Sequence, residues 1–202
     1  MRYKDKLRKQ MNDSNLRILT TKQVVDSLGV SVATASRVLD SLIEIGDLVR
    51  LKRGLYAHRD CSIYEIATHI NYPHDSYVSL QSALAHHGIY DQLPLVMTAV
   101  TKGPSGVFHT PKGRIELHQI DPKLFGGFAE DKHFKLASKE KAFLDLTYFW
   151  MKKGLRQRPE VDLDELRRSR IQELLEKFDD RFQSYFSRNI LPARSVSLQT
   201  IA

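Results

Sequence analysis

The sequence predicts an α+β protein in which an N-terminal winged helix-turn-helix, residues 1–60, precedes an α+β body, residues 61–202. Helical and strand-like hydrophobic patterns alternate along the chain, and a pair of helices followed by a basic hairpin stands near its start. Charge is uneven: residues 1–60 carry 12 Lys/Arg against 7 Asp/Glu, residues 61–150 carry 8 against 9, and residues 151–202 carry 11 against 8. A basic N-terminal unit on a neutral body favours binding to a polyanion.

Two short helices joined by a tight turn are expected at residues 22–45. Thr20 or Thr21 caps the first helix, and Gly29 ends it, because glycine accepts the positive φ of a helix terminus without a clash. Ser31 caps the second helix, expected at residues 32–45. One face of that helix carries an apolar stripe for packing: Ala35, Val38, Leu39, Leu42 and Ile45.

The opposite face of the second helix has the polarity of a DNA-recognition helix. Its N-terminal half presents Ala33, Ser36 and Arg37, which are small, polar or basic, whereas Asp40 and Glu44 follow in its C-terminal half. A recognition helix inserts its N-terminal end into the major groove, so acids at the far end are tolerated. This pattern favours double-stranded DNA as the partner.

A short basic hairpin follows the helix pair. Residues 47–51 and 55–57 are expected to form two strands joined by a turn at residues 52–54. Lys52 and Arg53 in that turn suit contact with phosphate or the minor groove. Winged helices also serve as protein–protein modules, and that alternative predicts no salt-sensitive DNA binding.

Residues 24–39 resemble the helix-turn-helix of lactose-repressor-type regulators, although Val25 stands where those proteins usually have alanine. The resemblance implies that the two residues after the serine cap read bases, and that the hydroxyl and guanidinium groups around them hold phosphates or base edges. The expected DNA-contacting residues are therefore Thr21, Ser31, Val32, Ala33, Thr34, Ser36, Arg37, Lys52 and Arg53.

The body is expected to mix helices and strands. Helices are predicted at residues 61–70, 79–87, 138–153 and 163–178, and strands at residues 95–101, 107–110, 114–120 and 134–137. Ser79 and Ser138 are expected to cap the helices that they precede. The helix after Ser138 has a broad apolar face, formed by Ala142, Phe143, Leu146, Phe149 and Trp150.

The sequence contains no recognisable catalytic constellation, so no enzyme, cofactor or metal is predicted. Ser79 and Ser82 lack the nucleophile-elbow pattern, and Gly126-Gly127 is interpreted as a tight turn. Residues 139–141, Lys-Glu-Lys, are interpreted as the charged decoration of a helix start. Two alternatives stay open: a zinc site using His58, Cys61 and a distant histidine, and a metal-dependent nucleic-acid-processing enzyme to which the winged helix delivers substrate.

Residues 16–150 are similar to the AbiEi family, the antitoxins of AbiE-type (type IV) toxin–antitoxin systems. The similarity is carried by RGLY at 53–56, YVSLQSAL at 77–84, GI at 88–89, QLP at 92–94, VT at 100–101, TPKG at 110–113, LFGG at 124–127 and ASKEKAFLDL at 137–146. It implies a repressor that binds an inverted repeat in its own promoter and neutralises a co-encoded nucleotidyltransferase-type toxin. The similarity fades after residue 150, which leaves open whether residues 151–202 complete the body or contact a partner. An ordinary winged-helix regulator is the other alternative.

The expected location is the cytoplasm. The single cysteine, Cys61, fits a reducing compartment, and the chain shows neither a signal-peptide pattern nor an apolar run of the length that crosses a membrane.

Overall fold

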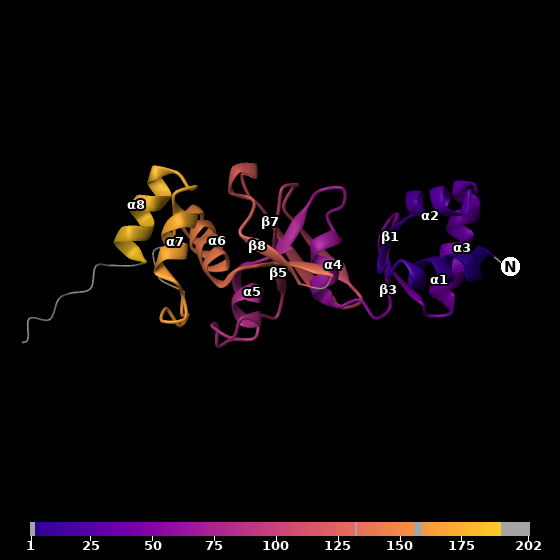
Figure 1. Ribbon diagram of the computed structural model, residues 1–202, viewed down its shortest axis with the longest axis horizontal. Coiled ribbons are helices and arrows are strands. Elements are labelled where there is room, and N and C mark those ends of the chain that lie inside the picture. Colours follow the sequence, from indigo (N-terminus) through magenta and orange to yellow (C-terminus); the bar gives the residue numbers. More distant parts are fainter. Residues whose placement is uncertain (1–2, 132, 156–158, 191–202) are drawn as a thin grey trace, which may run out of the picture.

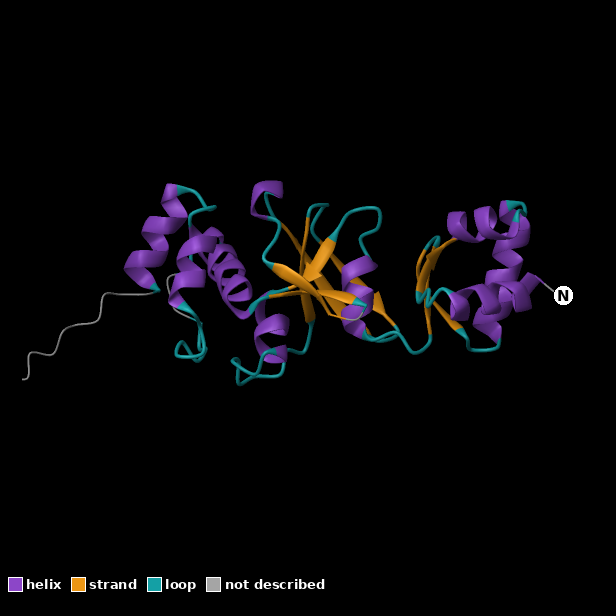
Figure 2. Ribbon diagram, viewed as in Figure 1, coloured by secondary structure: helices purple, strands orange, loops and turns teal. Residues whose placement is uncertain are grey.

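The computed structural model describes residues 3–131, 133–155 and 159–190, and it has the predicted α+β class. The molecule is elongated, with the N-terminal unit at one end, the strands of the body in the middle and the last helices at the other end (Figures 1 and 2). None of the helices described is long and apolar enough to cross a membrane.

The N-terminal unit is built from three helices and three strands: α1 (Tyr3–Asp13), β1 (Ile18–Thr20), α2 (Thr21–Leu28), α3 (Val32–Glu44), β2 (Leu48–Lys52) and β3 (Leu55–His58). The predicted helix pair and hairpin are present, and the arrangement is compatible with a winged helix-turn-helix. Sequence reasoning missed α1, which buries only Leu7 and Met11 in an otherwise polar stretch, and the three-residue strand β1. It also placed Ile45 in the buried stripe, but α3 ends at Glu44 and the Ile45 residue is 46% exposed.

The three strands form an antiparallel sheet in the order β1-β3-β2 that is covered on both faces. Alternate side chains of a strand point to opposite faces, and on β3 Tyr56 joins the core of the three helices, whereas Leu55 and Ala57 join the core of the body. On β1, Leu19 likewise joins the core of the three helices, and Ile18 packs against the core of the body. The helices therefore lie on one side of this sheet and the body on the other (Figure 1).

The body contains one six-stranded mixed sheet in the order β6-β7-β5-β4-β9-β8. Strands β4 and β9 run parallel, as do β5 and β7, and the other neighbours are antiparallel. The elements up to the sheet's last strand are α4 (Ile63–His69), β4 (Ser76–Val78), α5 (Leu80–His86), β5 (Met97–Thr101), β6 (Gly106–Thr110), β7 (Gly113–Gln119), the 3-10 helix η1 (Pro122–Leu124), β8 (Phe128–Asp131) and β9 (Phe134–Ala137).

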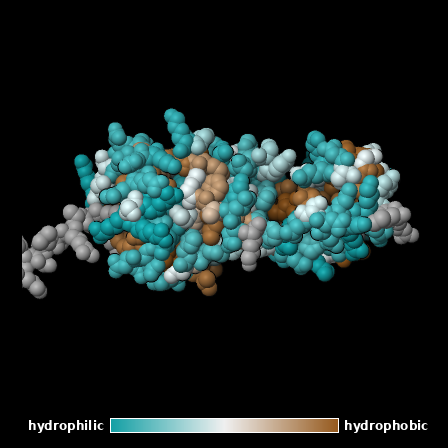
Figure 3. Space-filling model, viewed as in Figure 1, coloured by the Kyte–Doolittle hydropathy of each residue, from teal (hydrophilic) through white to brown (hydrophobic). Residues whose placement is uncertain are grey.

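The predicted strands at residues 107–110, 114–120 and 134–137 correspond to β6, β7 and β9, while β4 and β8 were not predicted. The strand expected from residue 95 begins at Met97, because Leu95 belongs to a loop in which it is 99% exposed. Surface colouring shows hydrophobic patches on the body and in the hollow where the N-terminal unit meets it (Figure 3).

Three helices follow the sheet in the described part of the chain: α6 (Lys139–Lys152), α7 (Arg168–Leu175) and α8 (Asp180–Asn189). Ser138 caps α6 as predicted, by accepting a hydrogen bond from the Lys141 amide at 3.2 Å. The helix predicted at residues 163–178 is present but shorter, because α7 runs only from Arg168 to Leu175, and the following helix, α8, was not predicted. The signal that was missed is Asp179, whose carboxylate caps α8 by accepting from the Phe182 amide at 2.8 Å.

Candidate nucleic-acid interface

Local hydrogen bonds fix the turn between α2 and α3. Thr20 and Gln23 form a reciprocal capping box at the start of α2, and Gly29 ends α2 in the left-handed conformation with φ 65°, donating to the Val25 carbonyl at 2.9 Å. Ser31 then caps α3 by accepting from the Thr34 amide at 3.2 Å. The start of α3 is therefore held in one orientation before any partner binds.

Because α3 packs its apolar face against the core, the residues predicted to contact bases lie on its solvent-facing side. Ala35, Leu39 and Leu42 have no exposed surface. On the other face Ser31, Val32, Ala33 and Arg37 are exposed, and Thr34 and Ser36 are half-buried. The structure thus brings these six predicted residues together on the first two turns of α3 and on its cap, as a surface that we call the α3 start.

The two predicted wing cations lie in different surroundings. Arg53 is exposed, whereas the Lys52 ammonium donates to the Tyr72 carbonyl at 3.3 Å and lies 5.9 Å from the centre of the Phe108 ring. Burial lowers the pKa of Lys52. The structure therefore directs Lys52 to the body. Thr21, also predicted to contact DNA, is half-buried against the hairpin turn, where its amide donates to the Gly54 carbonyl at 3.1 Å.

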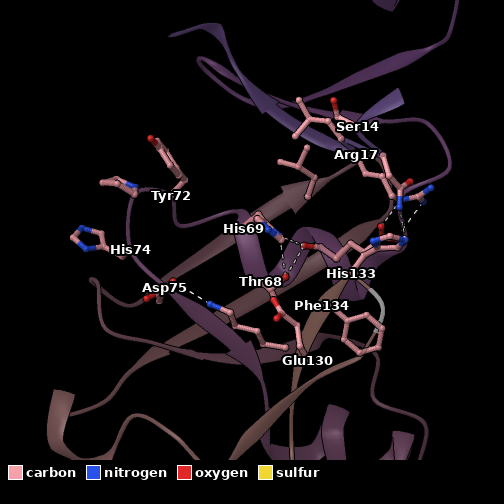
Figure 4. A pocket seen from close by; sticks show the side chains of 16 residues that line it. Ser14, Arg17, Thr68, His69, Tyr72, His74, Asp75, Glu130, His133 and Phe134 are labelled. Atoms are coloured by element: carbon pink, nitrogen blue, oxygen red, sulfur yellow. Dashed lines mark hydrogen bonds and ion pairs between the residues drawn. The ribbon is translucent and has the colours of Figure 1, made fainter. Parts of the chain in front are cut away.

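An ion pair joins the N-terminal unit to the body. The Arg17 guanidinium binds the Glu65 carboxylate and also donates to the Asp60 carbonyl at 2.6 Å. Burial opposes the charge of Glu65, but hydrogen bonds from Arg17 and Ser62 outweigh burial and lower its pKa. A cavity of about 450 Å³ lies beside this pair, lined by residues 14–18 and by side chains of the body that include His69, His74 and His133 (Figure 4).

The zinc alternative finds no support in the surroundings of Cys61. Its thiol is buried and donates to the Arg17 carbonyl at 3.2 Å, and burial raises its pKa to about 11. The His58 side chain lies 3.5 Å from the Asp60 carboxylate instead. Within the described ranges, no group of three or more His, Cys, Asp or Glu is placed to hold a metal ion.

A buried polar cluster in the body corrects two sequence interpretations. Ser79 does not cap α5; its hydroxyl donates to Asp145 at 2.8 Å, and the Tyr77 hydroxyl donates to the same carboxylate at 2.9 Å. Lys141 was expected to decorate a helix surface, but its ammonium lies 2.5 Å from the Asp145 carboxylate, with side-chain exposures of 3% and 0%. Glu140 is buried too and accepts from the Arg167 amide at 3.2 Å.

One known family matches a segment of the N-terminal unit. Residues 11–57, which run from the end of α1 into β3, match the family described as "Transcriptional regulator, AbiEi antitoxin". No curated protein matches the chain. The match contains the α3 start and the hairpin turn, and it supports the role of a transcriptional regulator and antitoxin for this chain.

Proposed function

We propose that this chain, whose residues 11–57 match the AbiEi regulators, is a DNA-binding repressor and the antitoxin of an AbiE-type system. In this proposal residues 1–60 act as a winged helix-turn-helix that binds an inverted repeat in the promoter of its own operon, in the cytoplasm. The observation that carries it is the α3 start, a rigid helix N-terminus with exposed small, hydroxyl and guanidinium side chains inside the matched segment.

Charge in the N-terminal unit supports this assignment. Arg37 is the only cation of α3, and it stands one turn from the helix start, while Asp40 and Glu44 lie farther along the helix. Arg53 adds a second exposed cation on the hairpin turn. Residues 1–60 carry a formal excess of five positive charges over this small unit. Such a surface attracts DNA through counterion release, so its affinity falls as salt rises.

Two of the residues predicted to contact DNA are bound to other parts of the chain. Lys52 is left out of the proposed interface, because its ammonium is bound to the Tyr72 carbonyl on the body. Thr21 is left out as well, because it is half-buried and its amide already donates to the Gly54 carbonyl. The proposed interface is therefore the α3 start together with Arg53.

A binding measurement tests the repressor role. Fluorescence anisotropy with labelled duplexes should show a preference for the region upstream of the operon over random DNA, with affinity that falls steeply with salt. Arg37→Ala should weaken specific binding about 5- to 150-fold if the guanidinium contacts a base, a loss of about 1–3 kcal/mol. The matched control is Arg168→Ala, which removes the same charge from an exposed residue of α7 at the other end of the molecule. Equal affinity for upstream and random DNA would overturn the proposal.

The antitoxin role has its own test. Co-expression with the product of the neighbouring gene should restore growth if that gene encodes a nucleotidyltransferase-type toxin, and the body, which carries most of the described chain, is the part proposed to be required. If the neighbouring gene encodes a metabolic enzyme, the ordinary-regulator alternative takes its place. Turnover of DNA, RNA or nucleotides by the purified chain with magnesium, manganese or zinc would instead favour the enzyme alternative.

A further inference from the structure

An apolar side chain projects into solvent at the first position of α3. Val32 is 63% exposed, whereas Ala35 and Val38, on the first two turns of the same helix, face the helical core with 0% and 8% exposed. Val25 and Val30, in the preceding helix and turn, also pack against that core. Packing among the residues that the structure describes therefore does not account for a branched apolar residue at this position.

The hydroxyl groups beside Val32 are occupied with holding the helix start. The Ser31 oxygen accepts from the Thr34 amide, and the two hydroxyl oxygens of these residues lie 3.1 Å apart in a hydrogen bond. Of their two hydroxyl hydrogens, one is used in that bond. One hydroxyl hydrogen of this pair stays available to a partner, whereas the exposed side chain of Val32 has no hydrogen-bonding group.

We infer that Val32 recognises the 5-methyl group of a thymine in the operator, an inference that rests on the proposed function. In the major groove the thymine methyl is the one apolar group that the four base pairs present, and the other base-edge groups there are hydrogen-bond donors or acceptors. If the isopropyl group of valine covered a donor or acceptor of a base, that group would lose its hydrogen bond to water and gain none in return. If it packs against the thymine methyl group, no hydrogen bond is lost and apolar surface of both groups is buried.

The size of the effect follows from the burial of one methyl-sized group. Such burial corresponds to an affinity change of about 4-fold per half-site, or about 15-fold for the two half-sites of an inverted repeat. Ala33, the neighbouring exposed residue, is smaller and offers less apolar surface. The thymine position should therefore depend mainly on Val32.

The test replaces thymines of the operator one at a time with deoxyuridine, which pairs in the same way but lacks the methyl group. With the full chain, one position in each half-site should lose about 4-fold in affinity by fluorescence anisotropy. In Val32→Ala the same replacement should change affinity less than about 1.5-fold, because the methyl then has no close apolar partner. Val107→Ala, at an exposed valine of β6 in the body, is the control and should keep the full penalty.

The possible outcomes separate this inference from the proposed function. If no deoxyuridine position matters, or if Val32→Ala keeps the penalty while the operator is still preferred over random DNA, Val32 does not recognise a methyl group and the repressor role stands. If the operator is not preferred at all, the proposed function fails. Circular dichroism of Val32→Ala should match that of the parent chain, because the replaced side chain is mostly in solvent.

Discussion

Replacing Asp145 with asparagine removes the negative charge that neutralises Lys141 inside the body. The two residues are four apart on α6, and the side chain of neither has more than 3% of its surface exposed. Asparagine keeps the size of aspartate, and its one amide oxygen can still accept from Tyr77 and Ser79. Its NH2 group then faces the ammonium, so the variant leaves Lys141 buried without a counter-ion and without that acceptor.

Breaking a buried ion pair by removing one partner typically lowers the free energy of unfolding by about 3–5 kcal/mol. The middle of that range is about 4 kcal/mol. For a chain of this length the melting temperature should fall by about 6–20 °C.

The chain supplies a matched control in Lys22 and Asp26, which also form a Lys–Asp pair four residues apart on a helix. Their side chains are 81% and 59% exposed, so Asp26→Asn should change the free energy of unfolding by no more than about 0.5 kcal/mol. Urea unfolding followed by circular dichroism at pH 7 measures both variants. A loss below about 1 kcal/mol for Asp145→Asn, or equal losses for both variants, would refute the reasoning.

A double replacement separates the cost of an orphaned charge from the contribution of the pair. Lys141→Met with Asp145→Asn leaves no buried ammonium, so the double variant should be more stable than Asp145→Asn alone. If it is equally unstable, the loss comes from hydrogen bonds or packing around residue 145 instead.

Three further predictions concern the junction and the hairpin. The depressed pKa of Glu65 contributes stability that is present above its ordinary pKa of 4.5 and is lost as pH falls through the pKa of the folded state. In Glu65→Gln the melting temperature should therefore fall less steeply as the pH is lowered. An unchanged dependence of melting temperature on pH would contradict this. Because the pKa of Cys61 is about 11 and the thiol is buried, iodoacetamide at pH 8 should label it in urea but not in the native protein, and rapid native labelling would show that the thiol is accessible. Arg53→Met should reduce the slope of log affinity against log salt by about one, whereas Lys52→Met should leave it unchanged, and equal slopes in the two variants would contradict the assignment.

The sequence was most informative where structure is determined locally. The caps Thr20 and Ser31, the left-handed Gly29 and the apolar stripe of α3 all depend on residues within a few positions of one another, so the helix pair was predictable. The contact of the Lys52 ammonium with the body was not predictable, because its partner Tyr72 lies twenty residues away in the sequence.

The body shows the same limit more strongly. Strand β4 has only three residues and is recognisable only through its neighbours β5 and β9, which come from distant parts of the chain. Lys141 and Asp145 look like an ordinary surface pair in the sequence, and burial makes them a core element because Tyr77 and Ser79 arrive from β4 and the start of α5. The sequence signal of this buried pair is a lysine four residues before the single acid of the mostly apolar stretch 142–151.

The sheet of the N-terminal unit, apolar on both faces, has a practical consequence for how the chain is divided. Cutting after residue 60 would expose Leu51, Leu55 and Ala57 on one fragment and the matching surface of the body on the other. It would also separate Arg17 from Glu65 and Lys52 from the Tyr72 carbonyl. A fragment of residues 1–60 should therefore self-associate or precipitate, and a short insertion at the boundary would uncouple the orientation of α3 from the body.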